Sequence, residues 1–210
     1  MVWAMTQSNE NVVHGDQKEG IPGTSLVNGF DMRKIQALVD AVKDQPQLAQ
    51  ASLSAKVAWR SGFFTEASIK DFTAGGMKND TSRPRPFTEA QDHPPELGGG
   101  KNKGATAGEL LLAALGHCVA GSFASAAAVM NVPIDSLNVE VEGSVDLHGV
   151  LGLPEPGAVR PGFQDLRVRY FVKSRAPRKQ LEDVAKLGET LSPVKDSLRA
   201  VEFSSQLILR

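Results

Sequence analysis

The chain has 210 residues, of which 41% are hydrophobic, with 23 Lys and Arg against 24 Asp and Glu. This near-neutral balance argues against a nucleic-acid-binding protein, which would carry a basic excess. A single cysteine, Cys118, excludes an intramolecular disulfide framework and a cysteine-rich zinc site, and it suits a reducing cytoplasm. We expect no secretory signal, because no basic segment followed by an apolar one opens the chain.

The first 50 residues predict an arm followed by a helical extension. Residues 1–27 are polar and without period, which indicates a flexible N-terminal arm. In the extension, residues 28–50, an amphipathic helix is expected over 30–43. Its single apolar stripe comprises Met32, Ile35, Leu38, Val39 and Val42. Residues 51–210 are expected to form the main domain.

The main domain begins with alternating segments at 53–60 and 63–69, which predict a β-hairpin. A loop over 73–104 follows, with a short strand near 86–90. Further predicted elements are strands at 137–147, 166–173 and 201–209, a helix at 177–190 with Ser174 as N-cap, and a short helix from Ser192 to Arg199. Because short connections favour antiparallel pairing, we predict an α+β fold.

A long apolar helix is predicted at 107–131. Residues 110–130 carry no formal charge and are long enough to span a membrane, but their alanine-rich composition and the half-polar strands nearby favour a soluble protein. A helix that is apolar all round must be covered on every side, by its own sheet and by a second subunit. Thr106 and Glu109 have the spacing of a capping box at its start.

The glycine-rich segment 98–104, Gly-Gly-Gly-Lys-Asn-Lys-Gly, superficially suggests a phosphate-binding loop. It lacks the Gly-Lys-Ser/Thr ending, GxGxxG cannot be placed on it, and no clear strand leads into it. Nucleotide binding is therefore not favoured. The four histidines (His14, His93, His117 and His148) lack metal-ligand spacing, so we expect neither a metal nor a cofactor.

Cys118 lies in the middle of the long helix and has two interpretations. It is a small core side chain, or it is a nucleophile that needs a nearby cation to hold its thiolate. His117 points about 100° away on a helix, so it is a poor partner. Arg60 at the end of the first hairpin strand is one candidate, and Arg83 and Arg85 in the following loop are others.

Several segments resemble the OsmC/Ohr family. The resemblance rests on residues 94–100 (Pro-Pro-Glu-Leu-Gly-Gly-Gly), 108–118 (Gly-Glu-Leu-Leu-Leu-Ala-Ala-Leu-Gly-His-Cys) and 191–198 (Leu-Ser-Pro-Val-Lys-Asp-Ser-Leu). Residues 139–143, 146–153 and 160–168 are similar to an OsmC-like subgroup. The resemblance implies an OsmC-like domain over 51–210, with curved antiparallel sheets around central helices in an intertwined homodimer.

The resemblance also implies a site. Cys118 occupies the position of the family's peroxidatic cysteine, and Arg60 is a plausible match for its activating arginine. The family's glutamate falls on Gly108, so the neighbouring Glu109 is a weak candidate. The second, resolving cysteine is replaced by Ser192, so an external thiol reductant would be required.

Three functions remain open at this stage. The first is that the chain is a cytoplasmic single-cysteine thiol peroxidase of the oxidative-stress response, which reduces organic hydroperoxides. Alternatively, it is a non-peroxidase OsmC-like protein that binds a small apolar or electrophilic ligand at the dimer interface. The third possibility is a structural or protein-partner role. None of these readings involves nucleic acid or a membrane.

Overall fold

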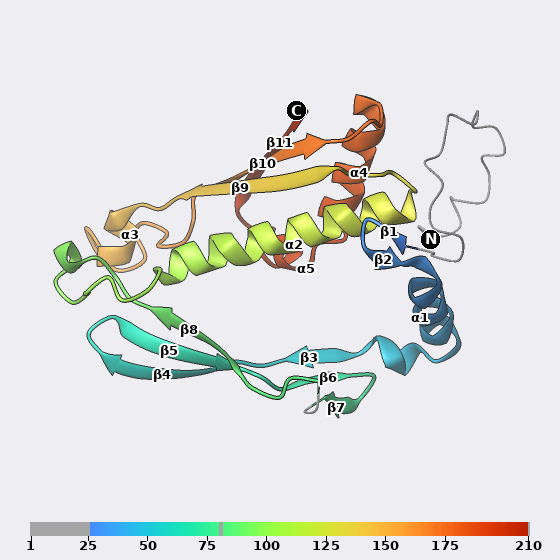
Figure 1. Ribbon diagram of the computed structural model, residues 1–210. Coiled ribbons are helices and arrows are strands. Elements are labelled where there is room, and N and C mark those ends of the chain that lie inside the picture. The colour runs from blue at the N-terminus through green and yellow to red at the C-terminus, as the bar shows by residue number, and fades with distance from the viewer. Residues whose placement is uncertain (1–25, 80–81, 210) are drawn as a thin grey trace. The chain divides into compact units, whose positions relative to one another are not determined.

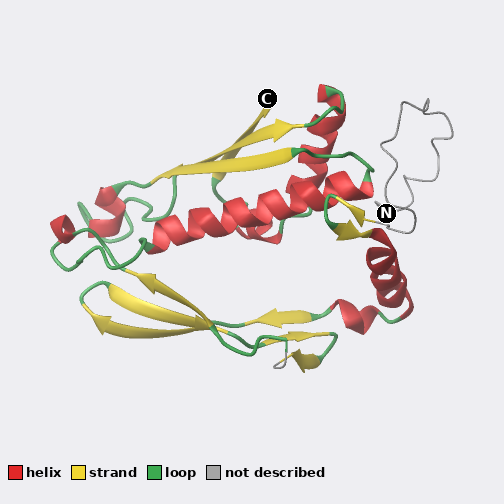
Figure 2. Ribbon diagram, in the orientation of Figure 1, coloured by secondary structure: helices red, strands yellow, loops and turns green. Residues whose placement is uncertain are grey.

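The computed structural model describes residues 26–79 and 82–209, so most of the arm expected at 1–27 lies outside the described residues. The chain divides into two compact units, one comprising Met1–Ile35 with Leu115–Arg210 and the other Gln36–Ala114. The two boundaries fall inside helices α1 (Met32–Asp44) and α2 (Ala107–Val129). Figure 2 shows that helices and strands are mixed in the first unit, whereas strands dominate the second.

The first unit is built on a three-stranded sheet of order β11-β10-β9 (Figure 1). Its strands are β9 (Ser136–Ser144), β10 (Asp165–Lys173) and β11 (Glu202–Leu209). Strands β9 and β10 pair antiparallel, as expected, but β10 and β11 pair parallel. The expectation of antiparallel pairing throughout is therefore wrong here. The reason is that the connection between β10 and β11 contains two helices and is long enough for a crossover.

Helices α2 and α4 (Arg178–Thr190) supply the other side of the core. On β10, alternate residues Leu166, Val168, Tyr170 and Val172 are buried, which is the period-two pattern of a sheet with one covered face. The Phe123 ring of α2 lies 5.5 Å from the Tyr170 ring. From α2, Leu115, Val119 and Phe123 are buried, and from α4, Leu181 and Val184.

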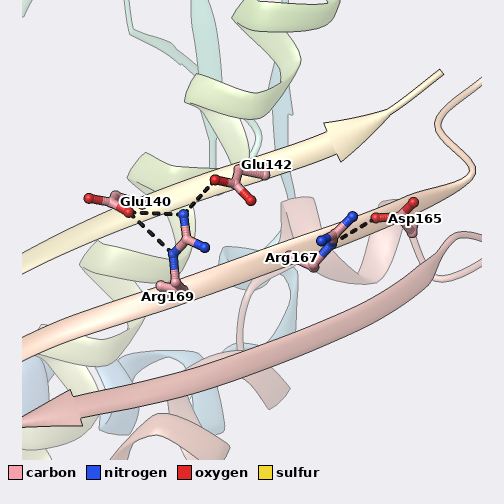
Figure 3. Close-up of polar contacts among 5 residues, drawn as sticks. All are labelled: Glu140, Glu142, Asp165, Arg167 and Arg169. Carbon is pink, nitrogen blue, oxygen red and sulfur yellow. Dashed lines mark hydrogen bonds and ion pairs between the residues drawn. The ribbon is translucent and has the colours of Figure 1, made fainter.

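The opposite face of this sheet is polar. Arg169 on β10 bridges Glu140 and Glu142 on β9, and Arg167 pairs with Asp165 along its own strand (Figure 3). All five side chains are at least partly exposed. Such exposed pairs add little stability, because water screens them.

Two boundaries in the first unit differ from the prediction. The strand expected to reach residue 147 ends at Ser144, because Asp146 accepts a hydrogen bond from the His148 amide and caps the short helix α3 (Leu147–Leu151). Ser174 is not the N-cap of α4, whose N-cap position is Pro177. The Ser174 hydroxyl instead donates to the Pro133 carbonyl and accepts from the Ala176 amide.

The first unit is completed by β1 (Leu26–Val27), β2 (Phe30–Asp31) and the short helix α5 (Pro193–Ser197). Asn28 sits in the left-handed region between β1 and β2. Its side-chain amide donates to the Val132 carbonyl and accepts from the Ile134 amide, which ties this hairpin to the chain after α2.

The second unit contains two three-stranded sheets, β4-β5-β8 and β3-β6-β7. The predicted hairpin is confirmed as β4 (Lys56–Ser61) and β5 (Phe64–Ile69), and the short strand near 86–90 as β8 (Phe87–Gln91). The remaining strands are β3 (Ala51–Leu53), β6 (Phe72–Ala74) and β7 (Met77–Asn79). Two 3-10 helices lie at Pro46–Ala49 and Pro95–Leu97.

The second sheet of this unit was not predicted. Strands β6 and β7 lie partly in the segment expected to be a loop, and Leu53 belongs to β3, not to the hairpin. Gly75 and Gly76 connect β6 to β7 with φ of 58° and 75°, which only glycine adopts readily. This Gly-Gly pair is the local signal of a hairpin that the composition of the segment obscured.

Candidate functional site

Cys118 and Ser192 are in direct contact in the first unit. Helix α2 presents the half-buried thiol of Cys118, the only cysteine of the chain. The Ser192 hydroxyl donates a hydrogen bond to the Cys118 Sγ over 3.1 Å, although 74 residues separate the two in sequence. Ser192 is only 1% exposed. The structure therefore brings together two of the residues that the sequence analysis singled out, Cys118 and Ser192.

The direction of the Ser192 hydroxyl follows from its second hydrogen bond. Ser192 is the N-cap of α5, as predicted, and its Oγ accepts from the Lys195 amide at 3.3 Å. A hydroxyl has one proton to donate, and here it goes to the sulfur. A donor aimed at sulfur stabilises the thiolate more than the neutral thiol, because hydrogen bonds to charged groups are stronger.

A second polar group lies next to this contact, and sequence reasoning missed it. The Glu189 carboxylate at the end of α4 accepts from Lys195 Nζ at 3.0 Å. Burial, together with the negative charge of Glu189, raises the pKa of the buried Tyr170. Lys195 Nζ further lies 4.4 Å from the centre of the Phe203 ring. These partners come from separate elements, so no local motif announces them.

The other arginine and glutamate candidates engage different partners. Arg60 on β4 is exposed and pairs with Glu66 of β5, with 2.6 Å between Nε and Oε2. Arg83 donates to the Lys70 carbonyl and lies over the rings of Phe72 and Phe87. Both arginines belong to the second unit, whereas Cys118 and Ser192 belong to the first.

Glu109 forms the capping box that its sequence predicted. Its Oε2 accepts from the Thr106 amide at 2.7 Å, and its own amide donates to the Thr106 hydroxyl at 3.2 Å. Hydrogen bonds from the Thr106 amide and hydroxyl lower the pKa of Glu109. The carboxylate thus reaches back toward the start of α2, while Cys118 lies nine residues further along the helix, about 13 Å by helical rise.

The glycine-rich segment 98–104 encloses a carboxylate of the chain itself. Asp92 is 1% exposed and accepts backbone N–H bonds from His93 (2.8 Å), Lys101 (2.9 Å) and Lys103 (3.1 Å). Burial raises the pKa of Asp92, but these three hydrogen bonds outweigh it, and the net shift is downward. The amides of Lys101 and Lys103 in this loop are thus hydrogen-bonded to a carboxylate of the chain itself.

Metal and membrane interpretations find little support in the described part of the chain. Over residues 26–79 and 82–209, no cluster of three or more His, Cys, Asp or Glu side chains is placed to hold a metal ion. Helix α2 is long and apolar enough to cross a membrane by length and composition alone. Core helices of soluble proteins share those properties, and α2 contributes Leu115, Val119 and Phe123 to the core described above.

Comparisons with known proteins agree on one family. A family model described as OsmC-like protein matches residues 100–205. Three solved structures each cover 75–76% of this chain and 96–99% of their own: OsmC-like proteins from Mycoplasma pneumoniae (14% identity, TM-score 0.54) and Vibrio cholerae (15%, 0.56), and an organic hydroperoxide resistance protein from Elizabethkingia anophelis (10%, 0.53). At these identities the structures show a shared fold. No curated protein matches at a significant level.

Proposed function

Because the chain belongs to the OsmC-like protein family, we propose that it is a single-cysteine thiol peroxidase of the oxidative-stress response. It reduces organic hydroperoxides with Cys118 as nucleophile and an external thiol as reductant. The observation that carries this proposal is the contact between Ser192 Oγ and Cys118 Sγ. It gives the sulfur a hydrogen-bond donor at the place where the family's peroxidases carry their second cysteine.

The proposed reaction has three steps: oxidation of Cys118 by the peroxide, formation of a mixed disulfide, and release of Cys118. The Cys118 thiolate attacks one peroxide oxygen, the O–O bond breaks, and the departing alkoxide takes up a proton to become an alcohol. Cys118 is then a sulfenic acid. An external thiol attacks its sulfur, releasing water and forming a mixed disulfide, and a second thiol frees Cys118 as thiolate while the two reductant sulfurs join. Ser192 cannot replace the external thiol, because a hydroxyl forms no disulfide.

We also propose that the protein acts as a homodimer. Five residues on α2 lie on one exposed stripe, at spacings of three and four: Ala107, Leu111, Ala114, His117 and Gly121. Strand β4 exposes 66% of Val57 and 71% of Trp59. Apolar surface of this kind favours a second copy that covers it. Members of the family are soluble, and the cytoplasm is the proposed location.

Arg60 remains the proposed activating cation. It lies on β4, an edge strand of its sheet, and about half of its side chain is exposed. An exposed ion pair such as Arg60–Glu66 is weak, so the guanidinium can exchange Glu66 for a thiolate at little cost. A thiolate needs such a cation or an equivalent donor to persist near neutral pH.

The test uses the full chain with tert-butyl hydroperoxide and dithiothreitol, following peroxide loss. We expect turnover by the wild type, none by Cys118→Ser, and slower turnover by Arg60→Met. If the wild type consumes no peroxide with either a monothiol or a dithiol, the proposal is wrong. The chain would then be better described as an OsmC-like protein that binds an apolar or electrophilic ligand.

A further inference from the structure

We infer that Lys195, anchored by Glu189, is a positioning residue that keeps the Ser192 hydroxyl directed at the Cys118 sulfur. This inference rests on the proposed function, because it assigns a task in preparing the nucleophile. Its test is nevertheless independent of peroxide chemistry.

The argument begins with the two roles of Lys195. Its backbone amide donates to Ser192 Oγ at 3.3 Å, and its side-chain ammonium contacts Glu189 Oε2 at 3.0 Å. The first contact occupies a lone pair of the hydroxyl and leaves the proton for Cys118. The second contact ties the first turn of α5 to the last turn of α4. Loss of the ammonium would therefore loosen the amide that orients the hydroxyl.

Helix α5 needs such an anchor because it is short. It has five residues, and an isolated helix of that length is not stable in water. Beyond its N-cap, Lys195 holds it from both sides, since Nζ contacts Glu189 and lies over the Phe203 ring of β11. The Lys195 side chain thus joins α4, α5 and β11.

The burial of the ion pair also favours a positioning role. The Lys195 and Glu189 side chains are 28% and 14% exposed, whereas those of the helix-surface pair Lys179–Asp183 are 78% and 48% exposed. Taking two charges out of water costs free energy that their attraction seldom exceeds. The arrangement is therefore better explained by the geometry it imposes on α5 than by stability alone.

The experiment is a double-mutant cycle read by the rate at which iodoacetamide alkylates Cys118 near neutral pH. Lys195→Met is made in the wild type and in Ser192→Ala. Removing a hydrogen bond to the thiolate should lower the alkylation rate roughly tenfold or more, and misdirecting that hydrogen bond should lower the rate by a smaller factor. We expect Lys195→Met to slow alkylation about fivefold in the wild type and less than about 1.5-fold in Ser192→Ala.

Two further variants complete the design. Lys195→Arg should restore most of the wild-type rate, because the guanidinium also reaches a carboxylate. Lys179→Met removes a lysine from an exposed pair on α4 and should leave the rate unchanged. If Lys195→Met does not fold, Glu189→Gln is carried through the same cycle.

The inference is overturned by either of two results. Equal slowing in both backgrounds would mean that Lys195 acts through its charge, and an unchanged rate in a folded Lys195→Met would mean that it does not act at all. If the alkylation rates follow the expected double-mutant cycle but the wild type turns over no peroxide, the proposed function is contradicted and the inference is supported.

Discussion

Gly188 of helix α4 lies against the backbone of helix α2 at Phe123. A Cβ atom added at Gly188 would be 2.8 Å from the Phe123 nitrogen and 2.9 Å from its Cα. Backbone atoms cannot rotate away as a flexible side chain can, so the two helices approach this closely only because position 188 has no side chain.

Replacing Gly188 by alanine should therefore destabilise the protein. Alanine gains about 1 kcal/mol in helix propensity, but overpacking a core contact costs about 1–3 kcal/mol. Because the atoms that the new Cβ meets belong to the backbone, we expect the cost to prevail and the free energy of unfolding in urea to fall by up to about 2 kcal/mol. Lys186→Ala on the exposed side of the same helix should stay within about 0.5 kcal/mol of wild type. Equal stability of the two variants would show that the α2–α4 contact is looser than described.

Replacing Ser192 by cysteine should create a resolving thiol. The new sulfur would take the place of the Ser192 Oγ, which now lies 3.1 Å from Cys118 Sγ. A disulfide requires Cα atoms within about 7 Å of each other. After peroxide treatment, intact-mass spectrometry should show the loss of two hydrogens in this variant and the gain of oxygen in the wild type.

The matched control for that experiment is Ser197→Cys. Ser197 is exposed and its hydroxyl donates to the Pro193 carbonyl within α5. The cysteine introduced by Ser197→Cys should form no disulfide with Cys118 under the same treatment. If Ser192→Cys remains folded yet forms no disulfide, Cys118 and Ser192 are not a degenerate peroxidatic pair, and the family supplies the fold without the chemistry.

Glu109 should behave as a helix cap. Thr106→Ala removes the hydroxyl that accepts from the Glu109 amide and should cost about 1 kcal/mol of unfolding free energy. Glutamine also serves in a capping box, so Glu109→Gln should stay within about 0.5 kcal/mol of wild type. A large loss of peroxide turnover in a stable Glu109→Gln would instead restore the catalytic interpretation of this residue.

Asp92 should make the protein sensitive to acid. Its pKa in the folded state lies below the ordinary 3.8, so its contribution to stability is present above about pH 4 and is lost as the pH falls through the lower value. Asp92→Asn removes the charge that accepts three amides. We expect its urea midpoint to lie well below wild type near neutral pH and to approach wild type near pH 3. Glu89→Gln, at an exposed position of β8, should lower the neutral midpoint far less.

The proposed dimer is tested through the exposed stripe of α2. Sedimentation of the wild type should give twice the chain mass of 22.4 kDa. Gly121 has no atom within 4 Å of an added Cβ in the single chain, so Gly121→Arg should fold but place a charge in the interface and sediment as a monomer. Gln206→Arg, on the polar face of the sheet, is the control. A monomeric wild type would contradict the dimer directly.

Features that depend on neighbouring residues were predictable from the sequence. The capping box of Thr106 and Glu109 and the N-cap at Ser192 each use groups within three residues, so their spacing alone announces them. The alternation of the β4–β5 hairpin is equally local.

Features that depend on distant segments were not predictable in the same way. The parallel pairing of β10 with β11 depends on how two intervening helices turn the chain, which no alternation pattern records. The contact of Glu189 with Lys195 joins α4 and α5, so only the folded chain shows it. The resemblance of residues 191–198 to a family motif pointed to Ser192, but it could not indicate what holds Ser192 in place.

The Asp92 carboxylate, enclosed by the glycine-rich loop 98–104, determines how readily the amides of that loop can bind a free anion. Asp92 accepts hydrogen bonds from the amides of Lys101 and Lys103 and belongs to the same chain, so its effective concentration at these amides is roughly millimolar or higher. A free phosphate would have to displace a competitor that never diffuses away, and would leave a buried charge behind. The carboxylate of Asp92 therefore competes with any free anion for these two amides.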